Sequence, residues 1–174
     1  MNNKIVVFIS GRGSNAKNII NYFSDNIDFQ VSHVFSNNKN SDFVNHIKNT
    51  NVQYFLFEEA EINGKVFREL KNINPKLIIL AGFLKKIPPL YINFFKNKII
   101  NIHPSLLPKY GGEGMYGLNI HKKVIENKEI ETGISIHYIS EEYDSGKIIF
   151  QKKIKVDKYD TPEKLEKKIH KLEY

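Results

Sequence analysis

Apolar residues fall into short continuous runs that alternate with segments of helical spacing. The first run covers Lys4 to Ser10 and stops at Gly11, which predicts a strand buried on both faces. A helix is predicted from Asn15, where Ala16, Ile19, Ile20 and Phe23 share one face. Further strands are predicted over 29–35, 52–57, 76–81 and 98–102, and helices over 43–47, 66–73, 88–95 and 118–125. This alternation predicts an α/β fold, a Rossmann-like doubly wound, mostly parallel sheet.

The last third of the chain departs from that alternation. Residues 133–139 predict a strand whose inward side chains are Ile134, Ile136 and Tyr138. Residues 147–156 alternate apolar and basic positions a short turn later, so the two runs predict an antiparallel hairpin. Thr161 followed by Pro162 is typical of a helix start, which predicts a final helix.

Composition places the chain among ordinary soluble domains. It has 174 residues, 41% hydrophobic and 26% charged, and a chain of this size buries about 70% of its surface. We expect one domain over residues 1–174. No apolar run approaches the ~18 residues of a membrane span, and the start does not resemble a secretory signal. The chain has no cysteine, which excludes disulfides and thiolate chemistry, and its histidines lack metal-ligand spacing. We expect a cytoplasmic protein without metal and without membrane contact.

The net charge of +7 comes almost wholly from lysine, because Arg12 and Arg68 are the only arginines. Ile, Asn and Lys are abundant throughout, which is typical of a compositional bias. Base-edge recognition favours arginine forks, and single-strand binding needs aromatics interleaved with a basic groove. Neither pattern is present, so we expect small-molecule partners and no nucleic acid.

The first candidate site follows the first strand, at Gly11-Arg12-Gly13-Ser14-Asn15. Such a loop presents backbone N–H groups and a helix N-terminus to an anion, so a phosphate is the natural ligand. A dinucleotide site would need an acid near residue 37, where Ser36, Asn37 and Asn38 stand, and no Lys-Ser or Lys-Thr completes a Walker motif. The alternative that the glycines only make a tight turn stays open.

The second candidate site is Asn101-Ile102-His103-Pro104, which follows a buried strand. Asn101 and His103 are two residues apart and point to the same side of an extended chain, which Pro104 favours. An amide and an imidazole at one point can polarise a carbonyl and stabilise an oxyanion. Ser105 lacks a nucleophile elbow. A hydrogen-bonded structural histidine is the alternative.

A third candidate, Asp144, lies in the turn of the predicted hairpin. A carboxylate beside His103 would orient the imidazole and raise its pKa. The alternative is an acid that holds its own turn.

In their order, these strings resemble the phosphoribosylglycinamide formyltransferase family, folate-dependent enzymes of purine synthesis. The resemblance covers nearly the whole chain and rests on Ile9–Asn15, Val34–Asn37, Leu80–Phe83, Asn101–Pro108 and Tyr143–Ile149, with Lys109–Gly117 similar to one subgroup.

The resemblance implies transfer of a formyl group from 10-formyltetrahydrofolate to the amine of 5-phosphoribosyl-glycinamide, without an acyl-enzyme. Asn101 and protonated His103 would stabilise the oxyanion, and Asp144 would orient His103 and a proton-relay water. The substrate phosphate would bind Gly11, Arg12, Gly13, Ser14 and Asn15, and Glu173 would bind the ribose or the amine. The folate would contact Leu84, Lys85, Lys86, Ile87, Asn101, Tyr143 and Asp144. The protein would be a monomer or homodimer.

The chain differs from the family pattern at two places. Leu84-Lys85 stands where many relatives have Met-Arg, so a point charge replaces a guanidinium fork. Relatives usually continue past the position of Tyr174, so we expect the last helix to be truncated. Methionyl-tRNA formyltransferases and formyltetrahydrofolate hydrolases carry an additional domain, which we do not expect in a chain of 174 residues. From another class, a noncatalytic nucleotide-binding module that uses only the phosphate loop is the alternative.

Overall fold

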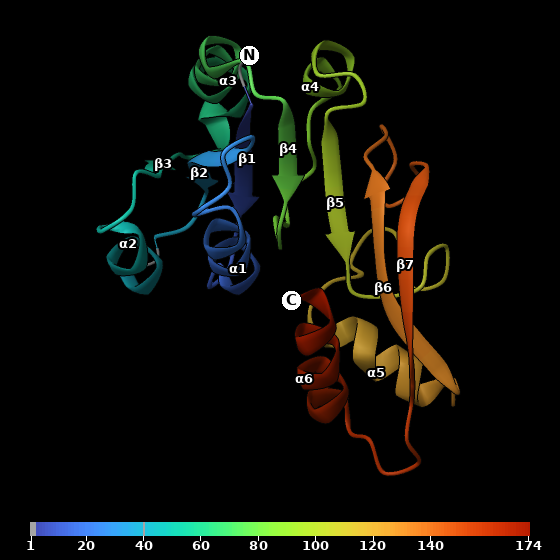
Figure 1. Ribbon diagram of the computed structural model, residues 1–174. Helices are drawn as coiled ribbons and strands as arrows, with labels where there is room; N and C mark the ends of the chain where they lie inside the picture. The colour runs from blue at the N-terminus through green and yellow to red at the C-terminus, as the bar shows by residue number, and fades with distance from the viewer. Residues whose placement is uncertain (1–2, 40) are drawn as a thin grey trace. The chain divides into compact units, whose positions relative to one another are not determined.

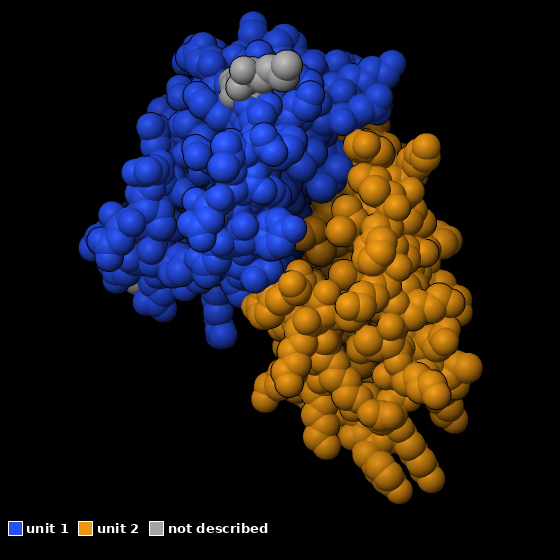
Figure 2. All heavy atoms as spheres, in the orientation of Figure 1, with its two compact units in different colours: residues 1–100 blue, residues 101–174 orange. Residues whose placement is uncertain are grey.

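The computed structural model describes residues 3–39 and 41–174, except the side chain of Ser41. The chain divides into two compact units, residues 1–100 and residues 101–174, which Figure 2 shows in blue and orange. The single domain expected over residues 1–174 stays a prediction.

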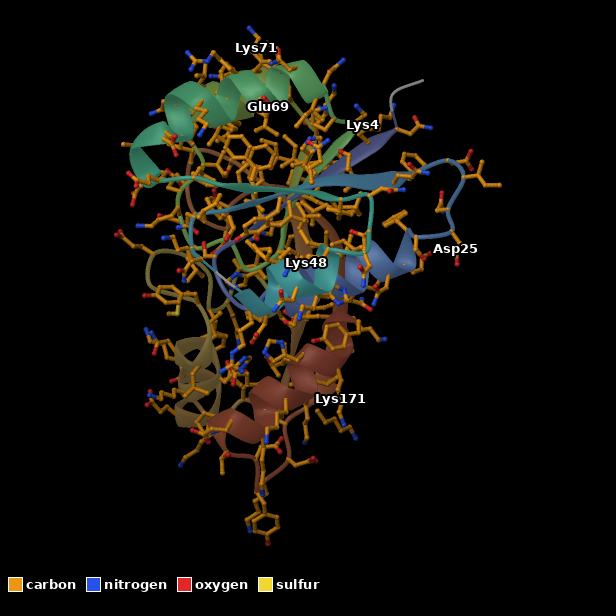
Figure 3. The ribbon with its side chains drawn as sticks, turned by 90° about the vertical axis from the view of Figure 1, so that its left-hand side faces the viewer. Lys4, Asp25, Lys48, Glu69, Lys71 and Lys171 are labelled. Carbon is orange, nitrogen blue, oxygen red and sulfur yellow. The ribbon has the colours of Figure 1, made fainter. Side chains whose placement is uncertain are left out.

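Unit 1 is built on four parallel strands that are hydrogen-bonded in the order β3-β2-β1-β4. Their bounds are β1 (Lys4–Ile9), β2 (Gln30–Ser36), β3 (Gln53–Leu56) and β4 (Leu77–Leu80). The helices are α1 (Ser14–Tyr22), α2 (Ser41–Ile47), α3 (Phe67–Ile73) and α4 (Pro89–Phe94). Figure 3 shows α3, with Glu69 and Lys71, on one face of the strands, and α1 and α2 on the other. Unit 1 is therefore doubly wound, as predicted.

The core of unit 1 lies on β1, the central apolar run. Val6, Val7 and Phe8 have no exposed surface, because helices cover both faces of this strand. Phe8 stacks on Phe35 with ring centroids 5.1 Å apart and meets the edge of Phe83 at 5.2 Å. This packing fixes the ends of β1 and β4, from which two predicted ligand-binding segments continue.

The predicted elements of unit 1 are confirmed with small shifts of their ends. The chain also makes a short 3-10 helix η1 (Glu59–Glu61) and a π-helical turn η2 (Ile62–Val66) before α3. These were not predicted, because a single turn carries too few apolar positions to show a period. Glu58 and Glu61 form a reciprocal capping box that stabilises this start.

The strand β5 (Ile99–His103) begins in unit 1 and ends in unit 2. In unit 2, β6 (Glu131–Tyr138) and β7 (Ile148–Lys155) pair antiparallel, with Ile134 opposite Lys152. This confirms the hairpin. The helices α5 (Leu118–Glu126) and α6 (Pro162–Glu173) lie side by side (Figure 1) and bury Ile120, Val124 and Leu165. Thr161 caps α6 by accepting the Lys164 N–H, as its position predicts.

The predicted inward face of β6 is partly wrong. Ile134 is buried, but Ile136 and Tyr138 are only half-buried, whereas Ser135 and His137 on the opposite face are fully buried. Period-2 alternation marks two faces but does not say which of them is covered, and hydrogen bonding makes burial of the polar face tolerable. Ser135 bonds the main chain of Ser105 and Leu107, for example.

No helix within residues 3–39 and 41–174 is long and apolar enough to cross a membrane.

Candidate active site

In unit 1, the glycine loop between β1 and α1 makes the sharp turn predicted for it. Gly13 adopts a left-handed conformation with φ 72°, and a Cβ at this position would collide with the Phe43 ring. The left-handed backbone and the lack of space for a Cβ both require glycine at this position, whether or not the loop binds a ligand. The Asn15 side-chain oxygen is buried and has no hydrogen-bond partner among residues 3–39 and 41–174, so it could accept from a ligand with N–H or O–H donors.

The predicted folate segment, residues 84–87, is tied to the same loop. The Leu84 N–H donates to Ser10 Oγ at 3.0 Å, and the Ser10 N–H donates to the Gly82 carbonyl at 3.0 Å. The Ile87 side chain is buried, whereas Leu84 and Lys85 are exposed. Lys85 Nζ lies 2.6 Å from Glu59 Oε2. The end of β1 and the chain after β4 thus form one hydrogen-bonded edge of unit 1.

In unit 2, a cluster of polar side chains gathers around Asp144. Asp144 Oδ1 accepts from Asn101 Nδ2 at 3.4 Å and lies 3.5 Å from His103 Nδ1. Asn101 and His103 therefore point to the same side of β5, as their spacing predicts. The structure also brings Asp144 to His103 across 41 residues of sequence, which the sequence alone did not show.

Asp144 is held in an uncommon backbone conformation. Its φ is 52°, and its Oδ2 accepts the Gly112 N–H at 3.0 Å. Burial raises the pKa of Asp144, but its interactions with His137 and His103 and the hydrogen bond from the Gly112 N–H together lower it below the ordinary value. The carboxylate form is therefore favoured, and the buried side chain supplies a fixed negative charge to the imidazoles around it.

Both nitrogens of His103 face polar partners. Nε2 lies 2.7 Å from the Tyr110 carbonyl, which can only accept, so Nε2 carries the hydrogen. Burial lowers the pKa of His103, and Asp144, the Tyr110 carbonyl and Glu173 offset only part of that effect. The neutral form with a lone pair on Nδ1 is therefore favoured at neutral pH. The expected protonated form requires additional negative charge nearby, which an oxyanion would supply.

His137 also belongs to this cluster, although no sequence motif indicated it. Its Nδ1 donates to the Tyr138 carbonyl at 2.9 Å, so its Nε2 accepts from Asn101 Nδ2 at 3.1 Å. The same Nε2 lies 3.5 Å from Asp144 Oδ1. Ser135 and His137 are polar residues two apart inside an apolar strand. That pattern was the signal that could have revealed a polar inward face.

Two further predicted residues lie in unit 2. The Glu173 carboxylate, at the end of α6, is nearly buried and lies 2.9 Å from His170 Nδ1. Its charge also raises the pKa of His103, so α6 contributes to the electrostatics of the cluster. Tyr143 is 41% exposed. Within the described part of the chain, no group of three or more His, Asp or Glu side chains is arranged to hold a metal ion.

The comparisons with known proteins agree with this fold. The sequence matches the formyl transferase family over residues 3–174, so the chain belongs to that family. Within it, the chain is 33% identical to phosphoribosylglycinamide formyltransferase of Haemophilus influenzae, covering 98% of this chain and 82% of the relative. A solved phosphoribosylglycinamide formyltransferase of Anaplasma phagocytophilum superposes with a TM-score of 0.88 at 31% identity, covering 98% of this chain and 80% of that one.

Plant relatives are longer. The chloroplastic phosphoribosylglycinamide formyltransferase of Arabidopsis thaliana is 36% identical over 97% of this chain, and the Vigna unguiculata protein is 34% identical over 93%. The chain spans 62% and 54% of their lengths.

Proposed function

We propose that this protein transfers a formyl group from 10-formyltetrahydrofolate to the primary amine of 5-phosphoribosyl-glycinamide. The observation that carries the proposal is the convergence of Asn101, His103 and Asp144 in unit 2, in a chain whose family and relatives are formyltransferases. The cluster contains an amide donor, an imidazole and a carboxylate, and none of its side chains is a covalent nucleophile. These groups suit direct attack of an amine on a carbonyl.

In the proposed reaction, the amine nitrogen attacks the formyl carbon and the carbonyl electron pair moves onto oxygen. Asn101 and protonated His103 stabilise that oxyanion. Both Asn101 N–H groups now serve His137 and Asp144, at 3.1 and 3.4 Å. Since the bond to Asp144 is long, it can be exchanged for a shorter bond to the oxyanion.

The proton of the attacking amine leaves through a water held by Asp144. We infer that His103 becomes charged at this stage, because the oxyanion offsets the burial that lowers the pKa of the free imidazole. The added proton resides on Nδ1, which faces Asp144. Collapse of the tetrahedral intermediate breaks the bond to N10 of the folate, which takes the electron pair and the proton that left the amine, returned from His103 through the same water. The products are the formylated amine and tetrahydrofolate.

The remaining residues would bind the two substrates. Gly11, Arg12, Gly13, Ser14 and Asn15 would hold the phosphate through the N-terminus of α1, whose first N–H groups have no acceptor within the helix. The backbone of residues 84–87 would contact the folate, as would Tyr143 at the turn before Asp144. Lys85 would attract the acidic folate tail as a point charge after leaving Glu59. Glu173 would accept from the substrate ribose or amine.

The decisive experiment is a formyl-transfer assay with both substrates on the wild type, on His103→Ala and on His46→Asn. We expect kcat of His103→Ala to fall by about 10²-fold or more, because an oxyanion-stabilising group is lost. His46 lies on α2 in unit 1, so His46→Asn controls for loss of a histidine outside the cluster. Undiminished turnover by His103→Ala would refute the mechanism, and a wild type without formyl transfer would refute the function.

A further inference from the structure

His103 depends on a main-chain group for its tautomer. The Tyr110 carbonyl accepts from Nε2 at 2.7 Å, and Ser105 Oγ also reaches this carbonyl at 3.4 Å. An imidazole whose Nε2 carries the hydrogen has its lone pair on Nδ1, toward Asp144. If the carbonyl were turned away, either ring nitrogen of a neutral His103 would be free to carry the hydrogen. The position of the Tyr110 carbonyl therefore decides where His103 gains and loses its proton.

That carbonyl belongs to a residue in an uncommon conformation. Tyr110 has φ 57°, in the left-handed region that a bulky side chain rarely adopts. A residue stays there only when its surroundings hold it. Two residues later, the Gly112 N–H donates to Asp144 Oδ2 at 3.0 Å. A short stretch of main chain thus contacts both His103 and Asp144, and any relaxation of Tyr110 would disturb both contacts.

The Tyr110 side chain ties this stretch to the turn after α5, and Ser105 Oγ also donates to the Lys109 carbonyl at 2.8 Å. The Tyr110 hydroxyl donates to Glu129 Oε1 at 2.9 Å and accepts from Asn127 Nδ2 at 2.9 Å. Lys109 Nζ lies 2.8 Å from the same Glu129 oxygen. The ring packs against the core of α5 and α6. We call Tyr110, Asn127 and Glu129 the tyrosine anchor; its last two members lie in the turn between α5 and β6.

We propose that Tyr110 is a positioning residue, whose side chain, tied to Asn127 and Glu129, sets its own carbonyl so that His103 keeps the Nε2–H tautomer. The role in catalysis rests on the proposed function. The tautomer itself is a property of unit 2 that can be measured without any substrate. Burial raises the pKa of the Tyr110 hydroxyl, which stays protonated and able to donate to Glu129.

The test uses Tyr110→Phe, which removes the hydroxyl and keeps the ring, with Tyr159→Phe as a matched control. Tyr159 is 80% exposed and lies outside the cluster. Nitrogen-15 NMR of the histidine rings reports which nitrogen of His103 carries the hydrogen. We expect Tyr110→Phe to show a mixture of tautomers where the wild type shows Nε2–H. We also expect kcat to fall on the order of 10-fold, because small misplacements of catalytic groups are costly.

Two variants of Glu129 separate positioning from general stability. Glu129→Gln keeps an acceptor oxygen and should keep the wild-type tautomer, whereas Glu129→Ala should resemble Tyr110→Phe. Because Tyr110 and Glu129 act through one hydrogen bond, the double variant Tyr110→Phe/Glu129→Ala should lose little more than either single variant.

The possible results are distinguishable. A Tyr110→Phe protein that keeps the Nε2–H tautomer overturns the proposal, whether or not its activity falls, because a lost rate would then reflect a structural role. A mixture of tautomers in Tyr110→Phe and Glu129→Ala, but not in Tyr159→Phe or Glu129→Gln, supports it. Should the wild type fail to transfer formyl groups, the proposed function fails while the NMR result still decides the role of Tyr110.

Discussion

Asp144 is the carboxylate on which the polar groups of the cluster converge. Its two oxygens face Asn101, His103, His137 and the Gly112 N–H at 3.0 to 3.5 Å. The contacts with Asn101, His103 and His137 are 3.4 to 3.5 Å long and individually weak, whereas the bond from the Gly112 N–H has an ordinary length. Their joint effect is to keep the carboxylate charged in a buried place, where a charge acts on its neighbours with little screening by solvent.

At this scale, we predict that Asp144→Asn lowers kcat by about 10²-fold, since the charge that supports a protonated His103 is lost. The variant is nearly isosteric, and asparagine tolerates the left-handed backbone that Asp144 adopts. The pKa of His103, followed by NMR, should fall below its wild-type value because Asp144 raises it. A variant with the wild-type rate and an unmoved His103 titration would remove Asp144 from the proposed mechanism.

The packing of α5 on α6 in unit 2 includes a titratable group that the proposed reaction does not use. His121 on α5 is buried, and its Nδ1 has no hydrogen-bond partner among the described residues. Burial, with a smaller effect of His170, lowers its pKa from 6.5 to about 4. His121 is therefore neutral in the folded protein and costly to protonate.

At the element scale, the burial of neutral His121 makes the free energy of unfolding depend on pH. Because the folded state has the lower pKa, the unfolded state binds more protons between pH 6.5 and about 4, and stability falls as the pH decreases through that window. Between pH 7 and pH 5, we expect His121→Gln to reduce the decrease in the free energy of unfolding by up to roughly 2 kcal/mol. Denaturant unfolding of the wild type and the variant at both pH values measures this difference.

Burial also lowers the pKa values of His33 and His103, so the His121→Gln variant should keep part of the pH dependence. An unchanged difference between the two pH values in His121→Gln would show that His121 does not contribute.

At the scale of the whole molecule, the charge of +7 needs no nucleic-acid partner to explain it. A dispersed positive field attracts small anions and raises their local concentration. Both proposed substrates carry negative charge. This field acts over the whole surface, so it does not show whether the glycine loop binds the phosphate. A test of that binding has to change the phosphate or the loop itself.

We therefore predict that removing the phosphate from the glycinamide substrate raises KM by about 10-fold or more, the value of one or two charge-assisted hydrogen bonds. Steady-state kinetics with the phosphorylated substrate and the unphosphorylated riboside measure this difference. High salt should reduce the difference between the two KM values only partly, because salt screens short hydrogen bonds to the loop less than it screens the long-range field. Equal KM values would favour the alternative in which residues 11–15 only make a tight turn.

Much of the fold was predictable because the relevant signals are local. The apolar runs of β1 and β4, the helical spacing after Asn15 and the Thr161-Pro162 helix start each depend on residues close in sequence. The turns η1 and η2 were missed because they are too short to show a period. The covered face of β6 was wrongly assigned because burial depends on what packs against the strand.

By itself, the sequence determined the α/β alternation, the antiparallel hairpin, the family, and the common side of Asn101 and His103. Periodicity and motif order carry this information. Only the tertiary structure decided that Asp144 meets His103, that His137 joins them, and which nitrogen of His103 carries the hydrogen. Those facts depend on hydrogen bonds between segments far apart along the chain, such as that from His103 to the Tyr110 carbonyl. Their geometry exists only once β5, β6 and the loops after them have folded together.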